Sequence, residues 1–183
     1  MASTVFIAKE SHPDESRVAA SVDTVKKLIG LGFDVVVQKG AGTASRIPDD
    51  AFANAGAKLG TAVSAKTADI VLKVRRPSDA EIKNYKKGAA VLAIMDPYGH
   101  EKELAALAKA GLTCFAMELM PRITRAQVMD VLSSQANLAG YQAVIDAAHE
   151  FDRAMPLMMT AAGTVPAAKV FVMGAGVAGL QAI

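Results

Sequence analysis

The fold is decided by the stretch Lys169-Val170-Phe171-Val172-Met173-Gly174-Ala175-Gly176-Val177-Ala178-Gly179-Leu180-Gln181-Ala182-Ile183. Its apolar beginning predicts a buried strand, and the residues at its end predict the start of a helix. The glycines between them have the G-x-G-x-x-G spacing of a dinucleotide-binding turn. In such a turn Gly174 allows the tight bend, Gly176 the close approach of a pyrophosphate, and Gly179 the close packing of helix on strand.

Phosphates bound by such a turn lie over the helix N-terminus, where unpaired N–H groups and the helix dipole favour negative charge. The predicted cofactor-binding residues here are Gly174, Gly176, Val177 and Gly179. The alternative is a glycine-rich loop that only turns the chain. The acidic residue that usually holds the ribose lies about 20 residues beyond the glycines. That position falls past Ile183, so we expect the sequence to be a fragment.

Composition excludes several classes of protein. Hydrophobic residues make up 52% of the 183 positions and charged residues 21%, which indicates a folded core rather than disorder. The net charge of +2 and the scattered basic residues argue against a nucleic-acid surface. No run approaches the ~18 apolar residues of a membrane span, and the N-terminus is not a secretory signal.

The single cysteine and the three histidines point to no reactive centre. Cys114 cannot form an internal disulfide, which fits a reducing compartment, and it is expected to be an inert buried thiol. The histidines have no partners at metal-ligand spacing, so no metal site is predicted. No nucleophile elbow and no phosphate loop ending in Lys-Ser or Lys-Thr occurs.

Strand and helix patterns alternate along the first two thirds of the chain. This alternation predicts an α/β fold with a mainly parallel sheet and helices on both faces. With the C-terminal turn it predicts two Rossmann-like domains, the second truncated after its first strand and glycine-rich turn. The expected strands are 5–8, 33–38, 69–74, 89–95 and 112–117, and the expected helices are 21–31, 48–56, 78–88 and 101–110.

Residues 125–153 interrupt the alternation. They contain no proline and one glycine, with apolar residues at helical spacing, which predicts one long helix linking two domains. Residues 155–166 are expected to be a connector. We expect the domain boundary inside the helix. An N-terminal α/β domain would then cover 1–135, and the linking helix with the start of the nucleotide-binding domain would cover 136–183.

The start of this helix carries a second candidate site. Thr124 and Gln127 have the form of a capping box. On a continuous helix Gln127, Asp130, Ser134 and Asn137 share one face, with Ser133 at its edge. Short amides, hydroxyls and one carboxylate suit ligand contact better than bulk solvation, and Arg122 lies just before the same face. Arg125 is unfavourable beside the positive end of the helix dipole, which suggests an anionic partner.

A purely structural interpretation of this segment stays open. Gln127 would then only complete the cap, Asp130 would only favour the helix N-terminus, and Arg122 would only pair with Asp130. Arg17 and Lys73 also allow two interpretations. They follow strands expected to be neighbours and would hold a carboxylate at the sheet edge, or they are ordinary surface charges.

Several segments together resemble the NAD(H)-binding component of proton-translocating NAD(P) transhydrogenase, the N-terminal section of its alpha subunit. The resemblance covers the whole chain. It rests on 10–19, 38–42, 70–74, 120–127, 132–141 and 172–183, and Pro121-Arg122-Ile123-Thr124-Arg125-Ala126-Gln127 is its most specific motif.

The resemblance implies hydride transfer between NAD(H) on this component and NADP(H) on a partner component. It implies a mobile loop in which Arg122, Gln127 and Asp130 are the catalytic group. The cofactor-binding set is Arg122, Arg125, Gln127, Asp130 and Ser133 together with the glycine turn. These side chains would act by orienting the nicotinamide, because the cofactor carries the chemistry.

The resemblance also implies a homodimer of two-domain protomers, with NAD in the cleft between the domains. A membrane-spanning component would couple the reaction to proton translocation. The chain is then expected in the cytoplasm, or on the matrix side in mitochondria, peripheral on the inner membrane through its partners. As a fragment it is expected to be inactive alone.

Two other functions stay open. One is an alanine dehydrogenase of the same superfamily, whose substrate-binding Arg and Lys match Arg17 and Lys73. That enzyme uses a histidine just after the fourth strand, whereas His100 lies several residues too late. The other is a non-catalytic interaction fragment.

Overall fold

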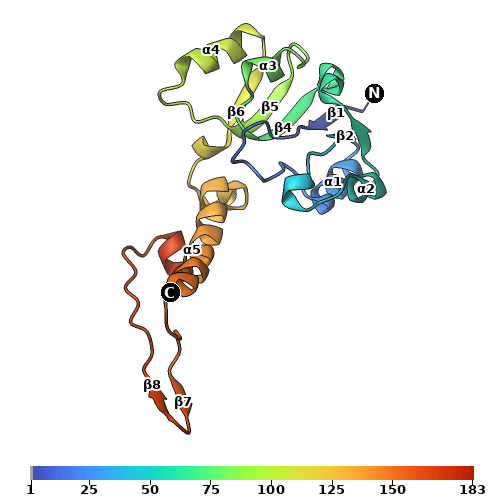
Figure 1. Ribbon diagram of the computed structural model, residues 1–183. Helices are drawn as coiled ribbons and strands as arrows, with labels where there is room; N and C mark the ends of the chain where they lie inside the picture. Colours follow the sequence, from blue (N-terminus) through green and yellow to red (C-terminus); the bar gives the residue numbers. More distant parts are fainter. Residues whose placement is uncertain (1) are drawn as a thin grey trace. The chain divides into compact units, whose positions relative to one another are not determined.

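The computed structural model describes residues 2–183, which divide into two compact units, one up to Met120 and one from Pro121 to Ile183 (Figure 1). The first unit contains one six-stranded sheet with its helices. The second contains a long helix, a short helix and a two-stranded hairpin.

All six strands of the sheet run parallel, in the order β3-β2-β1-β4-β5-β6. The strands are β1 Thr4–Ile7, β2 Asp34–Gln38, β3 Lys58–Gly60, β4 Ile70–Arg75, β5 Ala90–Ile94 and β6 Thr113–Ala116. The helices are α1 Val22–Gly30, α2 Asp49–Asn54, α3 Asp79–Ile82 and α4 Glu101–Lys109. This is the strand order of doubly wound nucleotide-binding folds, and it confirms the predicted α/β class.

Alternation along β1 divides the interior into two cores. Phe6 and Ala8 pack with Val91 and Leu107 in the core under α3 and α4. Ile7 points to the opposite face and joins the core formed with α1 and α2. Successive side chains of a strand face opposite sides of the sheet, so an apolar run such as Val5-Phe6-Ile7 is buried on both (Figure 1).

The helix boundaries follow local signals. The Ser21 side chain accepts a hydrogen bond from the Thr24 N–H at 3.2 Å and starts α1. Ser78 and Glu81 form a capping box at the start of α3. The helix predicted over 78–88 is nevertheless only four residues long, and the strand Lys58–Gly60 was not predicted. Three residues show too little alternation for recognition, and pairing with β2 forms this strand.

The second unit departs most from the sequence prediction. Its elements are a 3-10 helix at Thr124–Met129, α5 Val131–Glu150, β7 Met158–Thr160, β8 Gly163–Val165 and α6 Val177–Ala182. The long helix predicted over 125–153 therefore begins only at 131. The predicted connector contains the antiparallel hairpin β7–β8. No element among residues 2–183 is a helix with the length and apolarity needed to cross a membrane.

The run Lys169–Met173, predicted as a strand, is not hydrogen-bonded as one among the described residues. A strand exists only through hydrogen bonds to a neighbour, and the hairpin of this unit pairs only with itself. The run is therefore an extended lead into the glycine turn.

We expect Leu107→Ala to lower the free energy of unfolding by roughly 2–5 kcal/mol, because it removes a large side chain from a closed core. Leu107 is 2% exposed, whereas Leu31 is 75% exposed. Leu31→Ala is the matched control and should cost far less. Urea unfolding of both variants tests this, and equal losses would contradict the placement of the core.

Candidate functional site

The glycine turn has the conformation that its sequence predicts. Gly174 has φ +107°, in the region that favours glycine, and a Cβ there or on Gly176 would meet nothing within 4 Å. Gly176 is the N-cap of α6, and the Leu180 N–H donates to its carbonyl at 2.8 Å. Val177 is the first residue of that helix. The turn therefore presents an open glycine surface beside a helix N-terminus.

Gly179 is required by a close backbone contact. A Cβ at this position would overlap the carbonyl oxygen of Gly174 and stand 2.9 Å from its carbonyl carbon. It would also lie 3.6 Å from a methyl group of Val172. Any side chain larger than hydrogen would therefore push the helix off the turn.

The candidate segment around Arg122 is not a continuous helix. The predicted capping box of Thr124 and Gln127 is absent, because residues 124–129 form a 3-10 helix whose N-cap is Ile123, with no side-chain cap. Asp130 has φ −74° and ψ 98°, which ends that turn and makes it the N-cap of α5. The helical-wheel face predicted across 127–137 therefore does not exist as one surface.

Asp130 is fixed by its own helix. Its carboxylate accepts hydrogen bonds from the N–H groups of Leu132 (2.9 Å) and Ser133 (3.1 Å) and from the Ser133 hydroxyl (2.6 Å). The side-chain hydrogen bond from Ser133 is the main reason that the pKa of Asp130 is lowered, and the charge of Arg122 adds to the effect. Asp130 and Ser133 are thus held as one ionised, oriented pair.

The other predicted residues of this segment are exposed. Within the described chain the side chains of Arg122, Arg125 and Gln127 form no hydrogen bond or ion pair. The proposed structural pairing of Arg122 with Asp130 is therefore not an ion pair. Ser134 bonds back to the Val131 carbonyl at 3.3 Å. These observations leave two cations and one amide available beside the fixed Asp130–Ser133 pair.

Helices α5 and α6 pack against each other, so both candidate segments belong to the unit 121–183. The Asn137 side chain donates to the Gln181 side-chain oxygen at 2.8 Å. Asn137 was predicted to face a ligand and instead joins the two helices. The arrangement links the glycine turn to the helix whose N-cap is Asp130.

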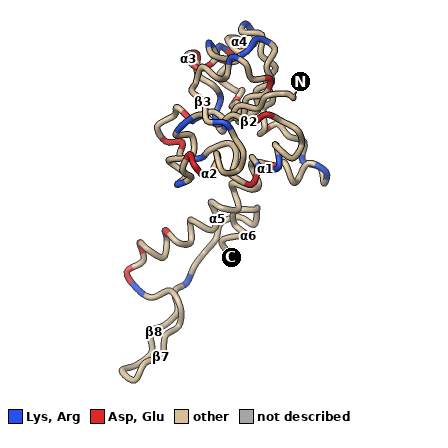
Figure 2. Tube along the Cα trace, turned by 90° about the vertical axis from the view of Figure 1, so that its right-hand side faces the viewer, with Lys and Arg blue, Asp and Glu red and all other residues tan. Residues whose placement is uncertain are grey.

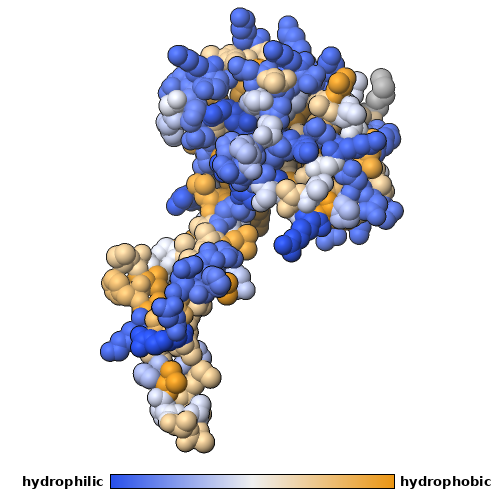
Figure 3. All heavy atoms as spheres, viewed as in Figure 1, coloured by the Kyte–Doolittle hydropathy of each residue, from blue (hydrophilic) through white to orange (hydrophobic). Residues whose placement is uncertain are grey.

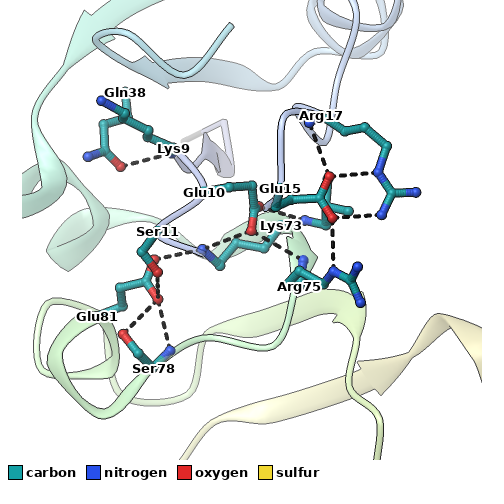
Figure 4. A network of polar contacts seen from close by, with 11 residues as sticks. Lys9, Glu10, Ser11, Glu15, Arg17, Gln38, Lys73, Arg75, Ser78 and Glu81 are labelled. Carbon is teal, nitrogen blue, oxygen red and sulfur yellow. Dashed lines mark hydrogen bonds and ion pairs between the residues drawn. The ribbon is translucent and has the colours of Figure 1, made fainter. Parts of the chain in front are cut away.

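A network of buried charges lies at the carboxyl edge of the sheet in the first unit (Figure 4). Lys73 of β4 is 4% exposed, so the alternative of ordinary surface charge is wrong for this residue. Its ammonium lies 2.6 Å from Glu81 and 3.3 Å from Glu10. The Glu10 carboxylate also accepts the N–H of Val74 at 2.7 Å. Lys73 is thus fully engaged by acids of its own chain.

Glu15 joins two arginines in the same region. Arg17 holds it through two hydrogen bonds of 2.7 Å, and Arg75 adds a third of 2.8 Å (Figure 4). The hydrogen bond from Arg17 is the largest cause of a Glu15 pKa lowered to about 2. Sequence reasoning recognised Arg17 and Lys73 but missed the three glutamates. Ser78-x-x-Glu81 was recognised only as a cap, although Glu81 also binds Lys73.

Other titratable groups give no further site. His100 approaches the Asp96 carbonyl with its Nδ1 at 3.0 Å, so it closes the turn after β5. Burial raises the pKa of Cys114 and of Tyr85. Residues 2–183 contain no cluster of three or more His, Cys, Asp or Glu that could hold a metal ion.

The Glu15 contacts predict a pH dependence. The ordinary pKa of 4.5 is lowered on folding to about 2, so the contribution of Glu15 to stability is complete above pH 4.5 and lost as the pH falls toward 2. We expect Glu15→Gln to be less stable than the wild type at pH 6, with a gap that narrows at pH ~3. Urea unfolding at both pH values measures this. A gap that does not depend on pH would contradict the ionised pairing.

Comparisons with known proteins agree with this geometry. The family model "Alanine dehydrogenase/PNT, N-terminal domain" matches residues 6–139, and the corresponding C-terminal-domain model matches 143–183. An NAD(P) transhydrogenase alpha subunit of Rhodospirillum rubrum is 53% identical over 98% of this chain and 48% of its own length. The alanine dehydrogenase of Halomonas elongata is 29% identical over 97% of this chain and 49% of its own length.

A solved structure gives the strongest agreement. The crystal structure of transhydrogenase from Sinorhizobium meliloti superposes with a TM-score of 0.96 at 74% identity. It covers 98% of this chain, which spans 54% of that structure. The chain thus spans about half the length of these relatives.

Proposed function

Because this chain belongs to the alanine dehydrogenase/PNT family, we propose that it is the NAD(H)-binding portion of a transhydrogenase. The complete protein would transfer hydride between NAD(H) on this subunit and NADP(H) on a partner, with proton translocation through a membrane component. The relative named transhydrogenase is much more similar to the chain than the alanine dehydrogenase, at 53% against 29% identity. The oxidoreductase class follows from the same relatives.

One observation carries the proposal. A glycine turn suited to a diphosphate and the exposed Arg122–Gln127 segment lie in the same compact unit, joined by the packing of α6 on α5. A dinucleotide needs both features, one for its phosphates and one for its reactive ring. The open space at Gly174 and Gly176 fits the close approach of a diphosphate to backbone.

In this proposal the turn binds the cofactor and the N-terminal end of α5 orients it. The N–H groups at Gly176, Val177 and the following residues hold the diphosphate, as helix N-termini hold anions generally. Arg122 and Arg125 add positive charge beside the cofactor. Gln127 contacts the carboxamide end, and the fixed pair of Asp130 and Ser133 holds the ribose. When bound, NAD(H) supplies the hydride, so the chain's own side chains act by position.

Contacts with partner chains belong to the same proposal. The hairpin β7–β8 carries no charged residue, and Met159 at 80% and Leu157 at 59% are exposed (Figures 2 and 3). We assign this apolar surface to a second copy of the chain in a homodimer, because burying it would remove exposed methionine and leucine from water. The chain would lie in the cytoplasm, on the inner membrane through its partner subunits, or on the matrix side in mitochondria.

The function is tested by mixing the full-length subunit with an NADP(H)-binding component and assaying hydride transfer from NADH to an NADP analogue. We expect transfer only when both are present, and none from residues 1–183 alone. Reduction of NAD by alanine, without any partner, would instead establish the amino-acid dehydrogenase function. Dimerisation of the full-length subunit without affinity for NADH would establish an interaction role.

Gln127→Asn tests the orienting role. We expect the rate of hydride transfer to fall by about tenfold or more, because a shorter amide cannot reach the same position. NADH affinity and thermal stability should change little, since Gln127 is exposed and caps no helix. Gln142→Asn, an exposed position later on α5, is the control and should leave the rate unchanged. A drop in melting temperature without a drop in rate would favour a structural role for Gln127.

A further inference from the structure

The contact between α5 and α6 is a backbone approach with no space for a side chain. Gly140 is the one buried residue of α5. A Cβ built on it would overlap the carbonyl oxygen of Ala178 and lie 2.9 Å and 3.0 Å from its carbonyl carbon and Cα. These are backbone atoms of α6, so no rotamer change relieves the overlap. Any residue other than glycine at position 140 must displace α6.

A polar contact fixes the other end of the same short helix. Asn137 lies three residues before Gly140, on the same face of α5, and donates to Gln181 at 2.8 Å. Ala178 and Gln181 are the second and fifth residues of α6. An isolated helix of six residues is not stable in water, so its position is set by what it packs on. Here it packs on α5 at two points, one steric and one polar.

The position of α6 is transmitted directly to the glycine turn. Gly179 follows Ala178, and its own missing Cβ lets it lie against the Gly174 carbonyl. A shift of Ala178 away from Gly140 therefore moves Gly179 and opens its contact with Gly174. The chain of contacts runs from Gly140 through α6 to the residue with φ +107°.

We propose that Gly140 and Asn137 are positioning residues for the dinucleotide-binding turn. They touch no cofactor and act by fixing α6 on α5, at a defined place relative to the Asp130 N-cap. This inference rests on the proposed function, in which the turn binds the diphosphate of NAD(H). A packing role alone would change stability without changing affinity for the diphosphate.

The first test is Gly140→Ala in the full-length subunit, with dissociation constants measured for NADH and for ADP-ribose. We expect both constants to rise by about tenfold or more and by similar factors, because both ligands carry the displaced diphosphate. The rate at saturating NADH should fall much less than the affinity. Gly30→Ala is the matched control, since Gly30 is a helical glycine of α1 whose Cβ would meet nothing within 4 Å.

A second set of variants covers the case in which Gly140→Ala fails to fold. Asn137→Ala and Gln181→Ala remove the two partners of one exposed hydrogen bond. We expect each to raise the dissociation constant of NADH by about three- to tenfold, and the double variant to be no worse than either single one. Independent, additive effects would show that the pair does not act as a unit and would overturn its role.

The outcomes separate this inference from the proposed function. If the wild-type subunit binds NADH and all these variants bind it equally well, the positioning role is wrong and the proposed function stands. A lower melting temperature of Gly140→Ala with unchanged affinities has the same meaning. If the wild-type subunit binds neither NADH nor ADP-ribose, the proposed function fails and the positioning role fails with it.

Discussion

The nucleotide-binding unit depends on backbone lying directly against backbone. At Gly140 and at Gly179 a single added carbon would overlap a carbonyl oxygen of the facing segment. Such contacts are stiff, because no side chain lies between the two segments to absorb a shift. A short helix with little stability of its own thereby acquires a fixed place. The glycine turn inherits its geometry from this packing as much as from its own sequence.

The sheet unit shows a different constraint, the burial of charge. Lys73 lies almost fully buried between Glu10 and Glu81, and Glu15 lies buried between Arg17 and Arg75. Removing these groups from water costs free energy that is offset only when each partner is present and hydrogen-bonded. Glu10 and Glu15 come from the segment after β1 and Glu81 from α3, whereas Lys73 and Arg75 belong to β4. The pairs therefore fix how the loop after β1 crosses the end of β4.

The same pairs bear on the choice between the two activities of the family. A cation that holds a substrate carboxylate must offer donors to it, and here the chain's own acids already engage Lys73 and Glu15 already takes two bonds from Arg17. His100 closes a turn with Asp96. Fold alone does not separate an alanine dehydrogenase from a transhydrogenase, because function belongs to the site that the fold carries. Within residues 2–183, exposed side chains suited to a cofactor lie around Arg122 and Gln127.

The sequence by itself determined the α/β class, five of the six strands of the sheet, most helix starts and the glycine turn. These features follow from short-range physics: apolar alternation, capping side chains, and the freedom of glycine at positive φ. Tertiary structure decided the rest. The break at Asp130, the pairing of Lys58–Gly60 with β2, the engagement of Lys73 and the seat of α6 on Gly140 became visible only there. Helical periodicity continues smoothly through residues 125–153, so only the three-dimensional partners of each residue reveal where the helix begins.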